Sequence, residues 1–159
     1  SPQRCGTAPP PVPQMIKPSK PDNEQARLDA LRRLRILDTP HEAAFDDLVA
    51  IASAVCGTPM GSVSLVDADR QWFKAKLGLQ GDQTPRDQAF CAHAILRPEE
   101  VMVVPDALQD PRFHDNPAVT DGARIRFYAG APLIASDGSA LGTLCVMDRR
   151  PRRLTDVQR

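Results

Sequence analysis

Residues 126–147, RFYAGAPLIASDGSALGTLCVM, contain the clearest hairpin pattern in the chain. Two largely apolar runs, 127–135 and 140–147, flank the turn sequence SDGS at 136–139. An Asp-Gly pair favours the tight turn that joins neighbouring antiparallel strands. The sequence therefore predicts an antiparallel sheet in which these two strands pair.

Side chains alternate with the period of two that is typical of strands in two upstream runs, residues 61–67 and 71–77. In the first run Val63 and Leu65 alternate with serines, which is typical of a strand. The sequence DADR at 67–70 separates the runs, and short acidic side chains favour turns because they can bond their own backbone. We expect a second hairpin here and a short strand at 101–104.

Helical spacing appears before and between these strands. Leucines recur every third residue in 24–37, and the sequence DTP at 38–40 predicts the end of that helix. A second helix is expected over 41–56, closed by Gly57, and a short one over 88–96. Residues 106–122 are rich in Asp, Asn, Pro and Gly, and predict a long loop with up to one helical turn. Antiparallel hairpins with helices packed on the sheet indicate an α+β domain.

Composition limits the size of this domain. The chain has 159 residues and 16 prolines, seven of which fall within the first 21 positions. Residues 1–23 therefore predict a proline-rich tail without a core, and Met15 is a candidate natural start. We expect the domain over 24–153, and residues 154–159 as the start of a truncated linker helix.

Charge and cysteine usage exclude several classes of protein. Twenty basic residues balance twenty acidic ones, which argues against general binding of nucleic acid. No apolar run is long enough to span a bilayer and no signal peptide is visible, so we expect a cytoplasmic protein without a membrane segment. The four cysteines are widely spaced, which predicts free thiols and no structural metal site.

Short motifs of one sensory family occur in a fixed order along the chain. They are LRILDTP (34–40), FDDL (45–48), SLVD (64–67), RQWFK (70–74), FCAHAI (90–95), VPDA (104–107), DPRF (110–113), RFYAGAPL (126–133) and GTLCV (142–146). Over about residues 24–159 the chain resembles the GAF family, sensory domains related to PAS domains. The resemblance is to GAF domains of bacterial sensor histidine kinases and diguanylate cyclases.

The resemblance implies a GAF/PAS-like antiparallel sheet of five or six strands. The terminal helices would pack on one face, and the short helix and long loop would enclose a pocket on the other. Family members bind small molecules there and pass the state of the pocket through terminal helices to an output domain, usually as homodimers. For this chain the resemblance implies a sensory module without catalytic residues, with an output domain of the histidine kinase or diguanylate cyclase type.

Six residues are candidates for the ligand pocket. Cys91 and His93 lie on the predicted short helix, but residues two apart point in different directions, so they cannot hold one metal ion together. Arg112 and Arg126 are the best-placed cations for an anion, although an Arg112–Asp110 pair would equally close the loop. Tyr128 carries a hydroxyl that needs a partner when buried. The candidates are Cys91, His93, Asp106, Arg112, Arg126 and Tyr128.

Residues 115–128 contain no cysteine, so no covalent bilin is expected, and the cofactor is unknown.

Two alternatives to the sensory module remain open. A thiol-dependent reductase of the free methionine sulfoxide type would use Cys91, but no resolving cysteine occupies 101–105. The second alternative is a dimerisation module with a filled pocket.

Overall fold

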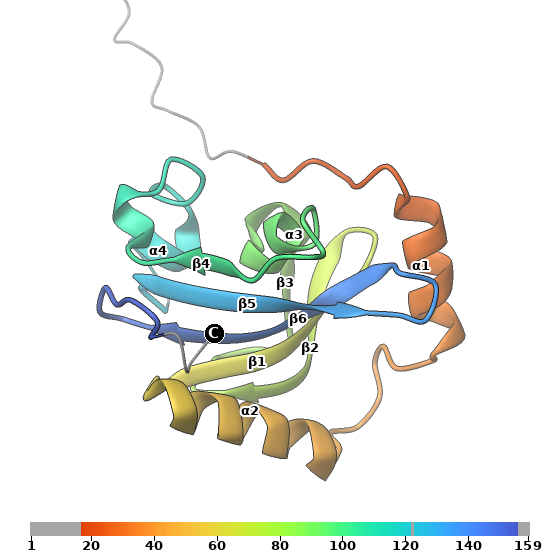
Figure 1. The fold of residues 1–159 in the computed structure, drawn as a ribbon, viewed down its shortest axis with the longest axis horizontal. Coiled ribbons are helices and arrows are strands. Elements are labelled where there is room, and N and C mark those ends of the chain that lie inside the picture. The colour runs from red at the N-terminus through yellow and green to blue at the C-terminus, as the bar shows by residue number, and fades with distance from the viewer. Residues whose placement is uncertain (1–16, 122, 156–159) are drawn as a thin grey trace, which may run out of the picture.

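The sheet predicted from the hairpins has six antiparallel strands in the order β3-β2-β1-β6-β5-β4 (Figure 1). The computed structural model describes residues 17–121 and 123–155. The α+β class and the GAF/PAS-like sheet are confirmed. The strands are β1 Met60–Val66, β2 Arg70–Leu77, β3 Gln83–Pro85, β4 Met102–Val104, β5 Phe127–Ile134 and β6 Ala140–Asp148.

The hairpin predicted from the SDGS turn is formed by β5 and the central strand β6. β5 pairs with β6 along its whole length, from Phe127 opposite Asp148 to Ile134 opposite Ala140. At the turn, the Ser139 amide donates to Asp137 Oδ1 at 2.9 Å, and Gly138 has a φ of 87° that favours glycine. The local turn chemistry therefore fixes the register of this hairpin.

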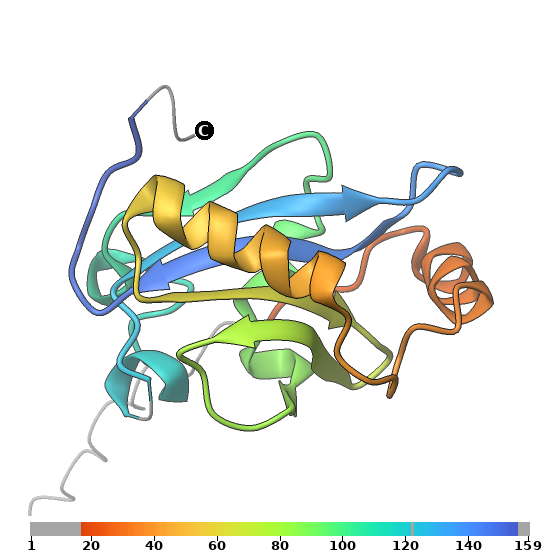
Figure 2. The same cartoon turned by 90° about the horizontal axis from the view of Figure 1, so that it is seen from below.

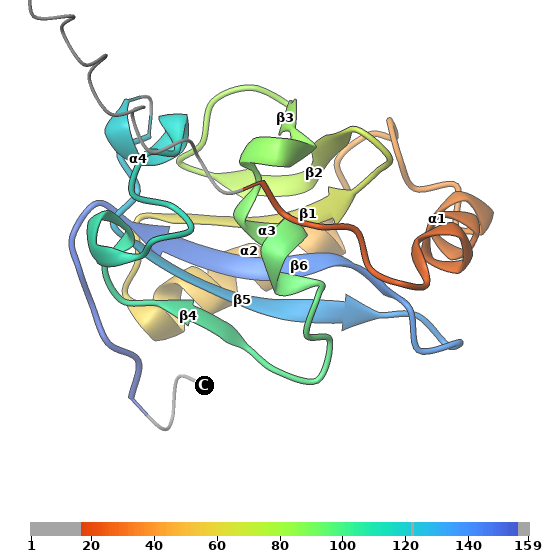
Figure 3. The ribbon, with the colours of Figure 1, turned by 90° about the horizontal axis from the view of Figure 1, so that it is seen from above.

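Helices lie on both faces of the sheet. α2, Ala43–Cys56, covers one face (Figures 1 and 2), and α3, Phe90–Ala94, with α4, Pro117–Thr120, lies on the other (Figure 3). Two short 3₁₀ turns, η1 at Arg86–Gln88 and η2 at Ala107–Gln109, complete the second face. The sequence analysis did not separate β3 from the following turn, because three residues are too few to show a period.

β1 is buried along its entire length because both of its faces are covered. Val63 packs with Val49 of α2, whereas the serines that alternate with it face the other way. The pairing of β1 with β2 shifts by one residue, so that Ser64 lies opposite Phe73 and Val63 opposite Ala75. Lys74 is the extra residue of this bulge, which places Phe73 on the face opposite α2.

The first helix is shorter than predicted. α1 spans Glu24–Arg33, and not residues 24–37, because Arg35 and Asp38 adopt positive φ angles of 50° and 58° that no helix continues. Ile36 and Leu37 instead pack into a cluster with Trp72 at the end of the sheet. Leu37 is thus packed beyond the helix, whereas Leu34 is exposed.

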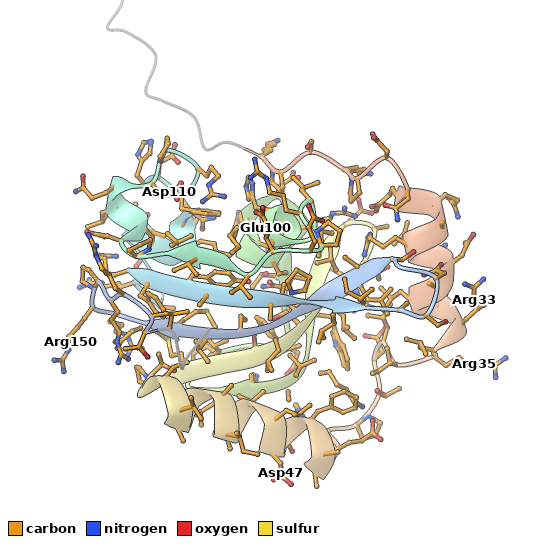
Figure 4. The ribbon with its side chains drawn as sticks, in the orientation of Figure 1. Arg33, Arg35, Asp47, Glu100, Asp110 and Arg150 are labelled. Carbon is orange, nitrogen blue, oxygen red and sulfur yellow. The ribbon has the colours of Figure 1, made fainter. Side chains whose placement is uncertain are left out.

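α1 lies beside one end of the sheet, while α2 is the described helix that covers the face (Figure 1). Ala30 and Leu31 of α1 pack on Leu65 and Trp72. Figure 4 shows Arg33 and Arg35 at the end of α1, pointing outward.

The two ends of the chain fall partly outside the described residues. Of the predicted tail, residues 17–23 are described and precede α1 without regular structure. Of the predicted C-terminal helix, Leu154 and Thr155 are described and are not helical, and 156–159 lie outside. Among the described helices, none is long and apolar enough to cross a membrane.

Candidate functional site

A cavity of about 560 Å³ lies on the face of the sheet opposite α2. Side chains of β1, β2, β5 and β6 form its floor. Residues 78–90 form one side, called the wall segment below, and 117–125 form the other. Its lining residues are Ser62, Ser64, Gln71, Phe73, Gly78, Leu79, Gln80, Thr84, Gln88, Phe90, Pro117, Ala118, Asp121, Ala123, Ile125, Tyr128, Cys145, Met147 and Arg149.

Hydroxyl and thiol groups line the centre of the floor. Ser62 Oγ lies 2.6 Å from Ser64 Oγ and 3.0 Å from Cys145 Sγ. Both serines are buried, at 0% and 1% exposure, although they face a cavity. A hydroxyl can donate and accept, so this cluster can turn either function towards a ligand.

A glutamine amide adjoins these hydroxyls. Gln71 Nε2 donates to Thr84 Oγ1 at 3.0 Å, and Gln71 Oε1 accepts from Cys91 Sγ at 2.5 Å. Both ends of the amide therefore have partners, which fix its orientation. The arrangement also joins β2 to the wall segment through a single side chain.

Aromatic rings build the apolar part of the cavity. The Phe90 ring lies 4.1 Å from Phe113 and 5.0 Å from Tyr128, measured between centroids. The Tyr128 hydroxyl lies 3.2 Å from Thr143 Oγ1. Burial raises the pKa of Tyr128 well above its ordinary value, so this hydroxyl stays protonated.

Of the six candidates, Tyr128 lines the cavity. Cys91 is fully buried behind it, and its contact with the cavity runs through Gln71. His93 lies on the same helix with its ring edge-on to Phe113, the centroids 5.0 Å apart. Neither Cys91 nor His93 is among the lining residues.

The other three candidates lie in the connections around β4. Asp106 caps η2 by accepting from the Leu108 amide at 3.1 Å. Arg112 binds Asp110 through two hydrogen bonds of 3.0 and 2.8 Å, the contact expected if this pair closes the loop. Arg126 donates to the carbonyl of Val119 at 2.7 Å.

The sequence analysis missed the floor of the cavity. Ser62 and Ser64 were interpreted as the polar side of an ordinary strand, and Cys145 as a free thiol. A signal was present, because serines alternating with apolar residues in a strand of a helix-covered sheet put hydroxyls on a buried face. Gln71, Thr84 and Gln88 carried no such signal, since polar residues on a short edge segment are usually solvated.

The thiols near the cavity are poor nucleophiles. Burial raises the pKa of Cys91 well above its ordinary value, and it also raises the pKa of Cys145. Since the thiolate is the reactive form, these environments do not favour thiol chemistry. Within 17–121 and 123–155, no three His, Cys, Asp or Glu side chains gather where they could hold a metal ion.

The fold and cavity are those of a sensory domain, and a family comparison agrees. The GAF domain model matches residues 40–159, so the chain belongs to the GAF family.

The chain is 46% identical over 138 residues to a curated relative, a Pseudomonas aeruginosa protein named cyclic di-GMP phosphodiesterase. The match covers 87% of this chain but 23% of the relative's length.

This relative corrects one expectation. The sequence analysis predicted that the protein is not an enzyme and suggested a histidine kinase or diguanylate cyclase as output, whereas the relative's name is that of a phosphodiesterase. The motifs that identify a GAF domain describe a sheet and its pocket. They carry no information about the chemistry to which a sensory domain is joined.

Solved structures share the fold at low sequence identity. A GAF domain of a Coxiella burnetii phosphoenolpyruvate-protein phosphotransferase matches with a TM-score of 0.60 at 17% identity, covering 84% of each chain. A domain of a Sinorhizobium meliloti protein described as a two-component sensor histidine kinase matches with a TM-score of 0.54 at 18% identity, covering 76% of this chain and 81% of that one.

Proposed function

We propose that this chain is the sensory domain of a protein that hydrolyses cyclic di-GMP, and that a small molecule bound in the cavity regulates that hydrolysis. The observation that carries the binding step is the polar cluster on the cavity floor, formed by the buried Ser62 and Ser64 and the half-buried Gln71. The 46% identity to a protein named cyclic di-GMP phosphodiesterase supports the second step. The expected homodimer, formed through the terminal helices, stays a prediction.

The polarity of the cavity favours an uncharged ligand. The polar groups of the floor are three hydroxyls, an amide and a thiol, none of which is ionised at neutral pH. An ion placed against them would lose its hydration without meeting an opposite charge. An uncharged molecule with hydroxyl or amide groups would match them and rest its apolar part on Phe73 and Phe90.

Charged side chains around the cavity are exposed or already paired. Asp121 and Arg149 line its rim and are exposed. Arg86 of the wall segment binds Glu24, and Arg126 binds a backbone carbonyl. The side chains of the floor include no cation, so a phosphate group buried there would meet no opposite charge. This argues against a nucleotide whose phosphate lies on the floor.

The test is a binding screen on the purified protein. Uncharged nucleobases, nucleosides, sugars and amides are compared with cyclic nucleotides by thermal shift, and each compound that binds is then titrated by calorimetry. We expect an uncharged compound to bind, and Ser64→Ala to weaken that binding roughly tenfold, because one hydrogen bond to the ligand is lost.

Ser53→Ala is the matched control, since Ser53 is also buried but lies on α2, on the opposite face of the sheet. It should leave the affinity unchanged. A screen in which no uncharged compound binds, or in which Ser53→Ala weakens binding as much as Ser64→Ala, would refute the proposal.

A further inference from the structure

The wall segment has two neighbours at once. Thr84 and Gln88 line the cavity, and Arg86 lies between them in sequence. The side chain of Arg86 is 5% exposed and binds Glu24, the first residue of α1. One short stretch of chain therefore contacts both the cavity and the N-terminal helix.

Glu24, Arg27 and Arg86 form what we call the ion cluster. Arg86 Nη2 donates to Glu24 Oε2 at 3.0 Å, and Arg86 Nη1 donates to the other oxygen of the same carboxylate. Arg27, which is fully buried, donates through Nε and Nη2 to the same two oxygens, each at 3.0 Å. A single carboxylate thus holds two guanidinium groups by bidentate contacts.

The β1–β2 connection anchors both arginines. Arg86 Nη1 donates to the carbonyl of Asp67 at 3.0 Å, and Arg27 Nη1 donates to the carbonyl of Val66 at 2.5 Å. Two buried cations with one carboxylate have no spare partner, so removing either contact leaves a desolvated charge. A displacement of Arg86 must therefore move Glu24 or lose that contact.

We propose that Arg86 is a positioning residue that couples the cavity wall to α1, an inference that rests on the cavity being the ligand site. A ligand contacting Thr84 or Gln88 fixes the position of η1, and Arg86 transmits that position to Glu24. α1 then differs in stability between the occupied and the empty cavity. Because energetic coupling is reciprocal, loosening α1 must also loosen the wall segment.

Reciprocity allows a test that needs no ligand. Native-state hydrogen exchange is measured by mass spectrometry on the wild type and on Glu24→Gln, a change on α1 that touches no lining residue. We expect at least tenfold faster exchange both in α1 (24–33) and in the wall segment (78–90), because a charged hydrogen bond is lost. Labelling times are kept short enough that β5 and β6, which open only on global unfolding, stay protected in both proteins.

The matched control is Glu100→Gln. Glu100 pairs with Arg97 at 3.7 Å, and this exposed pair lies in neither α1 nor the wall segment. Exchange in α1 and in the wall segment should stay within about twofold of the wild type, since exposed ion pairs contribute little. An equal effect of both variants would overturn the proposal.

Faster exchange in α1 alone, or in neither segment, would also overturn the coupling. If Glu24→Gln accelerates exchange in β5 and β6 as well, Arg86→Lys is judged by the same criterion, since it keeps the charge but not the bidentate contact. None of these measurements involves a ligand. Failure of the coupling would therefore leave the binding proposal intact, and a failed binding screen would leave the coupling measurable.

Discussion

The two faces of the sheet are built from alternate residues of the same strands, yet they differ in packing and polarity. On the α2 face, Val63 and Ala75 pack directly on Val49. On the other face, Ser62 and Ser64 leave a cavity of about 560 Å³. One face contributes stability through close contacts, and the other keeps polar groups and volume at the expense of such contacts.

This difference indicates where the domain can change without unfolding. A packed face responds to substitution by losing stability, since neighbouring atoms cannot shift freely. A substitution in the lining of the cavity lowers the affinity for a ligand instead, since the side chain already borders open space. Substitutions on the two faces should therefore differ in whether they lower stability or ligand affinity.

Phe127→Ala should be the most destabilising change. Phe127 is fully buried in a cluster with Cys56 and Val146 on the α2 face, and removing such a ring costs about 3–5 kcal/mol. Phe90→Ala on the cavity face should cost less, because the new space joins an existing cavity. Urea unfolding of both variants checks this order, and equal losses would mean that the two faces are packed alike.

Glu24→Gln should cost about 2 kcal/mol at neutral pH, because hydrogen bonds to a charged group contribute about 1.5–3 kcal/mol. Burial opposes ionisation, but hydrogen bonds from Arg86 and Arg27 lower the pKa of Glu24 from 4.5 to about 2. A carboxyl whose pKa is lowered by folding stabilises the fold at pH values above its pKa in the unfolded chain. This contribution is lost as the pH falls from about 5 towards 2.

The difference in unfolding free energy between wild type and Glu24→Gln should therefore be constant at neutral pH and shrink in acid. Comparing the two proteins cancels the other acidic groups whose pKa values are lowered, Asp38, Asp110 and Asp137. A difference that does not depend on pH would exclude a charged Glu24 as the stabilising form.

Gly61→Ala should cost about 2 kcal/mol, since overpacking a close contact has costs of this size. A Cβ at this position would lie 2.6 Å from Ser53 Oγ and 3.1 Å from Val49 Cγ1, so that α2 must move. Ser53 Oγ has no hydrogen-bond partner, and Ser53→Ala removes the closest atom. The double variant should recover about 1 kcal/mol in thermal unfolding, whereas strictly additive effects would contradict this explanation.

Ser64→Ala should have the smallest effect on stability, below about 1 kcal/mol, because Ser62 keeps its contact with Cys145. The same variant is expected to lose ligand affinity roughly tenfold, as argued above. Chemical denaturation and calorimetry on one preparation give both quantities. A large loss of stability would show that the hydroxyl cluster supports the fold, in contrast to the role assigned to this face.

Local patterns predicted most of the elements correctly. The SDGS turn at 136–139 predicted the β5–β6 hairpin, and the DADR turn at 67–70 predicted β1 and β2. The second helix begins two residues later than predicted and ends where Gly57 was expected to close it, with a φ of 65°. These elements depend on short-range hydrogen bonds and on the spacing of apolar side chains, which are properties of the sequence itself.

The site was predicted only in part. Tyr128 lines the cavity, but Arg112 and Arg126 have partners in the surrounding loops. A sequence identifies residues capable of binding an anion, yet the partner of a guanidinium depends on which carboxylate or carbonyl the folded chain brings near it. The spacing of Asp110 and Arg112 allowed Arg112 either to bind an anion or to pair with Asp110 and close the loop. In the fold, Arg112 pairs with Asp110.

The period of two and the turn residues predict the GAF sheet and its hairpins. The bulge at Lys74, which no local pattern indicates, turns Phe73 and Ala75 to opposite faces of the sheet. Only the tertiary structure decided that the serines of β1 face a cavity, and that Arg86 binds Glu24 sixty-two residues away. Contacts between distant segments depend on how the strands are ordered and on which buried charges must be paired. No local pattern encodes them.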